Sequence, residues 1–135
     1  MSKIPAVLLV DDDPTTNFLN KKLLLRLGVT DNIRVALNGQ EALHEMREHC
    51  QEQPTDCPVL VFLDINMPVM NGIQFMEAYQ QLPVEEQRAV VVVMLTTSVS
   101  PRDQQRVQEL PIADYLDKPL TQQQVERVLA QHFAE

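Results

Sequence analysis

The chain has 135 residues, which is enough for one domain with its own core and too few for two. Its 11 lysines and arginines are outnumbered by 19 aspartates and glutamates, and the net charge of −8 argues against direct binding to nucleic-acid phosphates. The apolar runs are far shorter than a membrane span, and Asp11 interrupts the first of them where a signal peptide would stay apolar. We therefore expect a globular cytoplasmic protein.

The first apolar run, Ala6–Val10, predicts a strand and leads into three consecutive aspartates. Asp13 before Pro14 is typical of a helix N-cap with proline at the first helical position. We expect one apolar stripe of this helix to face the core, made up of Thr16, Leu19, Leu23 and Leu27. A weaker, alternating run over residues 33–37 predicts a second strand at an edge of the sheet.

The middle of the chain repeats this alternation of helix and strand. Asn38 and Glu41 have the spacing of a capping box and predict a helix whose apolar stripe is Leu43, Met46 and Cys50. The uninterrupted run over residues 59–63 predicts a central strand that is covered on both faces. Asn71 and Gln74 then repeat the capping pattern before a helix with apolar positions at Ile73, Met76 and Tyr79.

The last third of the chain predicts two more strands and two more helices. The strands are expected over residues 89–95 and 112–116. Ser100 marks the start of a weakly apolar helix near residues 101–109, with Val107 and Leu110 as its main core contacts. The final helix is predicted to begin at Thr121, paired with Gln124, and to bury Val125, Val128 and Leu129.

Five strands that alternate with five helices predict one doubly wound α/β domain over residues 1–135, with a parallel sheet. Ligands of such sheets collect beyond the carboxyl ends of the strands. The residues that follow or end these strands are Asp11–Asp13, Asp64, Thr96 and Lys118. We therefore expect carboxylates, a hydroxyl and an ammonium to meet at one edge.

This combination of groups suits phosphoryl chemistry. A cluster of carboxylates without histidine or cysteine favours Mg²⁺ or a similar hard cation. A lysine and a hydroxyl opposite the cation can neutralise and bind a phosphoryl group, and a carboxylate can attack phosphorus to form an aspartyl phosphate. We assign Asp13 to the helix cap instead of this site.

The two cysteines need a separate interpretation. Cys50 and Cys57 are compatible with a reduced cytoplasmic protein, so we expect two ordinary thiols in and beside the end of a helix. A zinc site that includes His49 is the alternative, but the spacing fits no common ligand pattern and a fourth ligand is missing.

Four segments of the sequence resemble the signature blocks of the bacterial two-component response-regulator receiver domain. They are VLLVDDDP, FLDINMPVMNG, MLTTS and DYLDKPLT, in the order and spacing of that family, and together they cover essentially the whole chain. The resemblance implies a flavodoxin-like (βα)5 fold with strand order 2-1-3-4-5. It also implies a stand-alone receiver similar to the chemotaxis regulators, since the sequence leaves no room for an output domain.

The resemblance implies roles for the residues at the strand ends. Asp64 matches the phosphoacceptor. Asp11 and Asp12 match the acidic pair that holds Mg²⁺ together with Asp64, and Asn66 would add its backbone carbonyl to the metal.

Further roles follow from the third and fourth segments. Thr96 and Lys118 match the hydroxyl and the ammonium that contact the phosphoryl oxygens. Tyr115 occupies the position of an aromatic switch that responds to Thr96, although Thr97 is larger than the residue often found next to that threonine. The Lys118–Pro119 peptide bond is expected to be cis.

The family also implies partners. The phosphodonor would be a histidine kinase or a histidine phosphotransfer protein, and the protein would be a phosphoacceptor and not an enzyme. The net charge and the short apolar runs separately predict no direct nucleic-acid partner and no membrane insertion. Phe18 and Leu25 lie seven positions apart on one face of the first helix, opposite the predicted core stripe, with Lys22 between them. We predict that they contact the phosphodonor.

Two alternative functions compete with this interpretation. An aspartate-nucleophile phosphatase of the haloacid dehalogenase kind needs a second aspartate two residues after the nucleophile, where this chain has Asn66. A degenerate receiver that no longer takes phosphate should have lost Asp64 or Lys118, and both are present.

Overall fold

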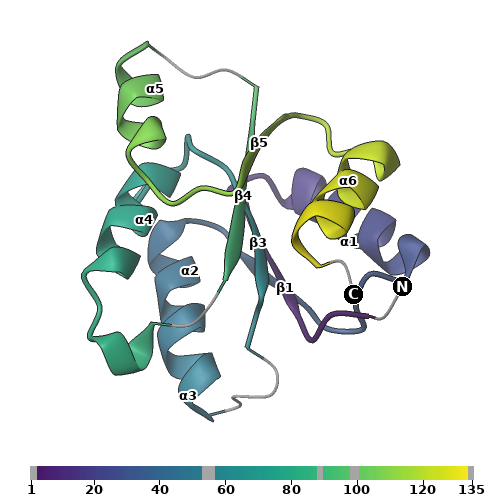
Figure 1. Ribbon diagram of the computed structural model, residues 1–135, viewed down its shortest axis with the longest axis horizontal. Helices are drawn as coiled ribbons and strands as arrows, with labels where there is room; N and C mark the ends of the chain where they lie inside the picture. The colour runs from purple at the N-terminus through teal and green to yellow at the C-terminus, as the bar shows by residue number, and fades with distance from the viewer. Residues whose placement is uncertain (1–2, 53–56, 88–89, 98–100, 134–135) are drawn as a thin grey trace.

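The computed structural model describes residues 3–52, 57–87, 90–97 and 101–133. A five-stranded parallel sheet in the order β2-β1-β3-β4-β5 lies at its centre, with helices on both faces (Figure 1). This arrangement confirms the predicted doubly wound, flavodoxin-like fold. The strands are β1 (Val7–Val10), β2 (Ile33–Ala36), β3 (Leu60–Leu63), β4 (Val91–Thr96) and β5 (Asp114–Asp117).

Helices connect successive strands. They are α1 (Pro14–Leu27), α2 (Gly39–His44), the π-helical turn η1 (Glu45–His49), α3 (Cys50–Glu52), α4 (Gly72–Gln80), the 3-10 turn η3 (Val84–Glu86), α5 (Pro101–Gln108) and α6 (Gln122–His132). Within the described residues, none of these helices is long and apolar enough to cross a membrane.

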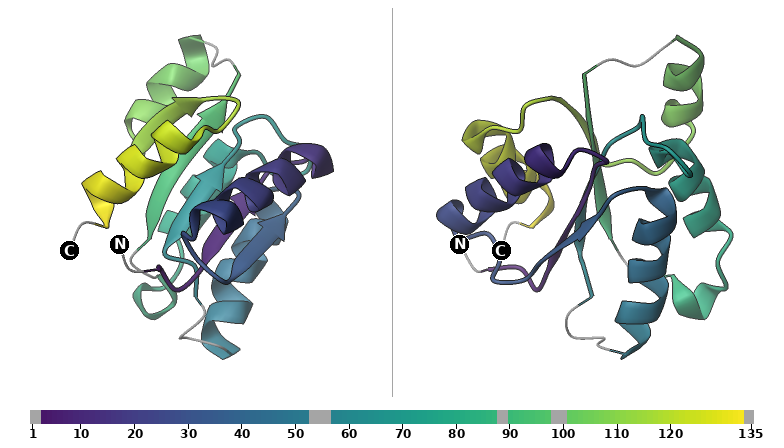
Figure 2. Two further views of the ribbon diagram at one scale, coloured as in Figure 1. Left: turned by 90° about the vertical axis from the view of Figure 1, so that its right-hand side faces the viewer. Right: turned by 180° about the vertical axis from the view of Figure 1, so that it is seen from behind.

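Helices α1 and α6 cover one face of the sheet, and α2, α4 and α5 cover the other (Figures 1 and 2). Successive side chains of a strand point to opposite faces, so each central strand feeds two cores. In β1, Leu8 and Val10 belong to the core under α2 and α4, while Val7 and Leu9 belong to the core under α1 and α6. Burial on both faces explains why the central strands are uninterrupted apolar runs.

The two edge strands differ from the central ones. The alternating run forms β2 at one edge, as predicted, and Val35 there is 40% exposed. The fifth strand begins later than the predicted residue 112, because ladder pairing starts at Val93 opposite Asp114. Ala89 and Ser100, predicted as a strand start and a helix cap, lie outside the described residues.

Most predicted helix starts are confirmed. The capping boxes at Asn71 and Thr121 form completely, with both reciprocal hydrogen bonds. Asn38 accepts a hydrogen bond from the backbone N–H of Glu41 at 2.9 Å. The Glu41 carboxylate instead accepts from the N–H of Leu37, at 3.0 Å, so this third box is only half formed.

The predicted core stripe of α1 is only partly confirmed. Leu23 and Leu27 pack against the core under α1 and α6, but Leu19 is 56% exposed, and the fully buried positions of this helix are Asn17, Asn20 and Leu24. Leucines occupy positions 23, 24 and 25 consecutively, so the apolar pattern selects no single face. The helix is turned so that two asparagines face the sheet, which a count of apolar residues cannot foresee.

The two cysteines form a disulfide, so the expectation of two free thiols is wrong and neither sulfur is left for a zinc ion. Cys50 follows η1 and Cys57 precedes β3. Met46 and Cys50, four residues apart across η1, share a helix face and are both buried.

Candidate functional site

Three carboxylates meet at the carboxyl end of the sheet. Val10 of β1 pairs with Leu63 of β3, so the residues that follow, Asp11 and Asp64, emerge side by side. Asp12 is the next residue after Asp11, and one ligand oxygen of each of the three lies within 4.8 Å of the others. Asp11 and Asp64 are buried, whereas Asp12 is exposed. An all-oxygen donor set open on one side fits a hard divalent cation.

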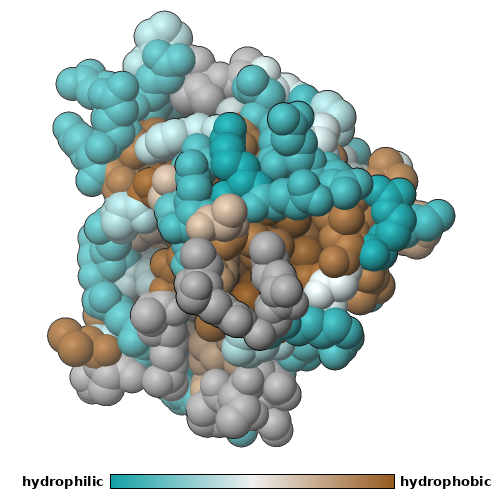
Figure 3. Space-filling view, turned by 45° about the vertical axis from the view of Figure 1, so that its right-hand side comes forward, coloured by the Kyte–Doolittle hydropathy of each residue, from teal (hydrophilic) through white to brown (hydrophobic). Residues whose placement is uncertain are grey.

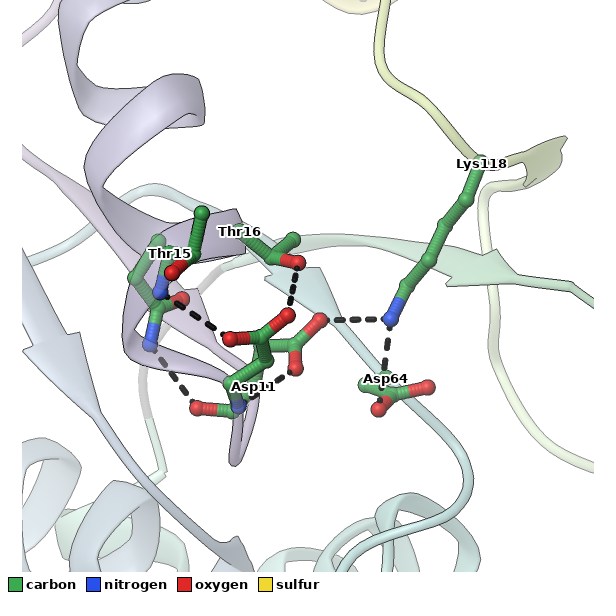
Figure 4. Close-up of polar contacts among 7 residues, drawn as sticks. Asp11, Thr15, Thr16, Asp64 and Lys118 are labelled. Carbon is green, nitrogen blue, oxygen red and sulfur yellow. Dashed lines mark hydrogen bonds and ion pairs between the residues drawn. The ribbon is translucent and has the colours of Figure 1, made fainter.

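Lys118 brings an ammonium to this cluster from the end of β5. Its Nζ lies 2.5 Å from Oδ2 of Asp11 and 3.4 Å from Oδ2 of Asp64 (Figure 4). The Lys118–Pro119 peptide bond is cis, as predicted. The cation therefore bridges two carboxylates that come from other strands of the sheet.

The charges of the cluster shift two pKa values. Burial raises the pKa of Asp64 above its ordinary value, and the neighbouring Asp11 charge raises it further; Lys118 opposes both effects. Burial by itself disfavours the charged form of Lys118. The hydrogen bond to Asp11 and the charges of both carboxylates nevertheless raise its pKa. The Lys118 ammonium thus stays charged, while the ionised form of Asp64 has an electrostatic cost that Lys118 offsets only in part.

Asp13 caps α1, as predicted. Its Oδ2 accepts from the hydroxyl of Thr16 at 2.9 Å and its Oδ1 from the backbone N–H of Thr15 at 3.0 Å (Figure 4). These two hydrogen bonds, that of Thr16 first, lower the pKa of Asp13. The third acid of the run is thereby explained by the helix start.

The remaining predicted site residues surround this cluster. Thr96 is the buried last residue of β4, and its carbonyl accepts from the N–H of Lys118 at 3.0 Å. Asn66 is exposed in the loop after β3, and its backbone N–H helps to keep Asp64 ionised. Tyr115 is 44% exposed, and its hydroxyl donates to the carbonyl of Val107 in α5 at 3.1 Å.

Two glycines that the sequence analysis did not single out hold the loop after Asp64. A Cβ at Gly72 would lie 2.3 Å from the carbonyl oxygen of Asp64, and a Cβ at Gly39 would lie 2.7 Å from that of Met70. The N–H of Gly39 donates to the same Met70 carbonyl at 2.7 Å. The signal was available, since the chain has only 3 glycines and two of them stand at helix starts.

The described geometry matches a known family. The model of the response regulator receiver domain matches residues 7–130. The chain belongs to this family. It is a receiver domain of two-component signalling, as the four segments of its sequence predict.

Individual relatives agree with this assignment. Two-component response regulator 24 of Arabidopsis thaliana is 33% identical over 120 residues, which cover 89% of this receiver domain and 77% of the relative. The sensor histidine kinase GacS of Pseudomonas protegens is 32% identical over 129 residues, covering 95% of this chain but only 13% of the kinase. A two-component response regulator from Cytophaga hutchinsonii has a TM-score of 0.84 at 27% identity, over 99% and 100% of the two chains.

The raised pKa of Asp64 predicts how stability depends on pH. A carboxyl whose pKa is higher in the folded state holds its proton more tightly there, so its effect favours folding at low pH and weakens as the pH rises through the folded pKa. Without divalent cations, Asp64→Asn should therefore raise the melting temperature of the receiver domain at pH 7. The gain should vanish as the pH falls below the ordinary carboxyl value of 3.8.

Thermal unfolding followed by circular dichroism between pH 3.5 and 7.5 measures this dependence. Asp31→Asn, which removes an exposed carboxylate far from the cluster, serves as the control. An equal gain for Asp64→Asn at every pH would contradict the electrostatic explanation.

Proposed function

We propose that this receiver domain accepts a phosphoryl group on Asp64 from the phosphohistidine of a histidine kinase or a histidine phosphotransfer protein. The observation that carries the proposal is the Lys118 ammonium between Asp11 and Asp64, at the edge of a carboxylate cluster. The similarity to one segment of the sensor histidine kinase GacS supports a donor of this class. The protein would act as a signalling phosphoacceptor, one domain over residues 1–135, and not as an enzyme with its own substrate.

In the proposed reaction a carboxylate oxygen of Asp64 attacks phosphorus. A P–O bond forms, the P–N bond to the donor imidazole breaks, and its electron pair stays on the imidazole nitrogen. The Lys118 ammonium and the Thr96 hydroxyl would bind the phosphoryl oxygens and stabilise the charge of the transition state. These groups come from rigid strand ends, so little reorganisation is needed.

We propose Mg²⁺ as the cofactor, because the cluster offers only oxygen ligands. Asp11, Asp12 and Asp64 would hold the ion, together with the backbone carbonyl of Asn66. When bound, the ion supplies positive charge that screens the three carboxylates and the incoming phosphoryl group. The exposed position of Asp12 leaves a path from solvent to this side of the site.

We propose that Tyr115 reports the phosphorylation state. A cavity of about 350 Å³ is lined by Thr96, Val107 and Tyr115, among others, so there is room beside Thr96 for a different ring position. Movement of the Thr96 hydroxyl toward the phosphoryl group would favour an inward Tyr115 rotamer. The ring would then give up its hydrogen bond to the Val107 carbonyl and change the surface formed by α5 and β5.

We propose that α1 carries the docking surface for the phosphodonor. Phe18 is 64% and Leu25 47% exposed, as predicted. Figure 3 shows apolar side chains on the side of the molecule that carries α1 and α6. Lys22 is also exposed beside them, so the patch has a basic rim. Exposed aromatic and apolar anchors of this kind often dominate binding energy.

The cytoplasmic location of this receiver domain stays a prediction.

The phosphoacceptor assignment predicts single labelling at Asp64. Incubation with acetyl phosphate and Mg²⁺ should add one phosphate, visible by intact-mass analysis, because the Asp64 carboxylate and the Lys118 ammonium beside it are already in place. EDTA and Asp64→Asn should each abolish the added mass, whereas Asp31→Asn should keep it. Persistent single labelling of Asp64→Asn would refute the assignment.

The switch proposal predicts a local response to an acyl-phosphate mimic. Beryllofluoride with Mg²⁺ should shift the amide NMR signals of residues 101–116, because Tyr115 releases the Val107 carbonyl. Tyr115→Phe removes the hydroxyl but keeps the ring, so it should already show part of this shift without the mimic. Unchanged signals in this region of the activated wild-type protein would rule the switch out.

The docking proposal predicts a loss that depends on the donor. Phe18→Ala combined with Leu25→Ala should slow phosphotransfer from the cognate histidine protein by about 30-fold, since the loss of two anchors at about 1 kcal/mol each removes about 2 kcal/mol of binding free energy. Labelling by acetyl phosphate and the melting temperature should stay unchanged. Val84→Ala, an 84% exposed apolar residue in η3, is the matched control. Equal transfer rates for wild type and the double variant would show that the patch is not used.

A further inference from the structure

The buried face of α1 contains an amide in an unusual place. Asn17 is 4% exposed and faces the sheet, where a helix of this kind normally presents an apolar side chain. A buried amide costs free energy unless its polar atoms find hydrogen-bond partners. The partners of Asn17 therefore indicate what this residue does.

Asn17 holds the turn that carries two of the acidic residues. Its Nδ2 donates to the backbone carbonyl of Asp11 at 2.8 Å. The N–H of Asp11 is held on the other side by the carbonyl of Ala36 in β2, at 3.1 Å. In the part of the chain that the structure describes, Asn17 is the one donor that reaches the Asp11 carbonyl.

The other polar atom of this amide reduces what Asn17 contributes to the stability of the fold. Oδ1 of Asn17 is buried and has no hydrogen-bond partner among the described residues. An unsatisfied buried oxygen offsets much of what the bond to Asp11 contributes to folding. A residue that is costly for stability yet bonded to the acidic turn is better explained by what it positions.

The Asp11 carbonyl belongs to the peptide group that joins Asp11 to Asp12. Fixing that peptide plane fixes the amide nitrogen and Cα of Asp12, and the hydrogen bond from the N–H of Asp13 to the Asp11 carboxylate restrains the peptide that follows, so together they limit the direction in which the Asp12 side chain leaves the backbone. The Asp11 carboxylate is separately held, by the N–H of Asp13 at 2.9 Å and by Lys118. Asp12 is exposed, and its carboxylate makes no comparable hydrogen bond or ion pair among the described residues. The orientation of the Asp11–Asp12 peptide group is therefore the main restraint on the Asp12 side chain.

We propose that Asn17 is a positioning residue for the metal site: its amide holds the Asp11–Asp12 peptide so that the Asp12 carboxylate is placed to bind a divalent cation. This inference rests on the proposed Mg²⁺ dependence and extends it to a residue that does not touch the ion. Partners that orient metal ligands in this way commonly change metal affinity by tenfold or more when removed.

The test compares two matched substitutions in α1. Asn17→Leu keeps the size of the side chain and removes the amide; Asn20→Leu makes the same change at the other buried asparagine, which makes no hydrogen bond to the acidic turn in the described chain. Mg²⁺ is titrated into each ¹⁵N-labelled protein, and the dissociation constant is read from the amide shifts of Asp12 and Asp64. We expect about tenfold weaker binding for Asn17→Leu and a change of less than twofold for Asn20→Leu.

The melting temperature of each variant without metal separates positioning from folding, because a positioning role weakens Mg²⁺ binding in a protein that is fully folded. If Asn17→Leu does not fold, Asn17→Ala is titrated in its place. Equal Mg²⁺ affinity of wild type and the Asn17 variant would overturn the inference, and so would equal weakening by both leucine variants. A wild-type protein that binds no Mg²⁺ would instead overturn the cofactor assignment on which the inference rests.

Discussion

The main constraint on this structure is the repulsion between two buried carboxylates that lie side by side at the carboxyl end of the sheet. The register of β1 and β3 places Asp11 and Asp64 next to each other, and water reaches neither freely. Repulsion between carboxylates at such a distance costs several times more here than in water. Lys118 compensates part of this cost from the end of β5, and so the two ends of the chain are tied together electrostatically at the site.

The strand ends also separate the two surfaces that the proposed function would use. The apolar patch of Phe18 and Leu25 lies on α1, in the layer that also contains α6. Tyr115 contacts α5, in the layer on the opposite face of the sheet. The acidic cluster lies between these layers, so a donor bound to one layer and a target bound to the other would not compete for the same surface. In that proposal the sheet would be the rigid element that both surfaces share with the site.

Much of this arrangement could be predicted from the sequence, because covered parallel strands leave a strong pattern. Continuous apolar runs located the central strands, and residues directly after them located Asp64 and Lys118. The helix caps at Asp13 and Asn71 could also be predicted, because each capping hydrogen bond joins residues only two or three positions apart.

The features that escaped prediction depend on contacts between distant segments. The orientation of α1 is set by what the sheet offers each face, and three adjacent leucines gave no local preference. The Cys50–Cys57 disulfide joins a helix to the segment before β3, and the π-helical turn that precedes Cys50 has no reliable sequence signal. Asn17 looked like an ordinary polar residue, since its role appears only when the carbonyl that it reaches is known.

The close approach of Gly72 to Asp64 has a mechanical consequence. Because the first residue of α4 touches the carbonyl of Asp64, with a hydrogen bond from its N–H to the Ile65 carbonyl at 3.0 Å, no slack separates the strand end from the helix. Gly39 attaches the start of α2 to the same loop through Met70. The loop after Asp64 and the starts of α2 and α4 are therefore joined by direct backbone contacts. If phosphorylation moves this loop, the backbone itself, and not only a rotating side chain, would carry the change to the helices on one face of the sheet.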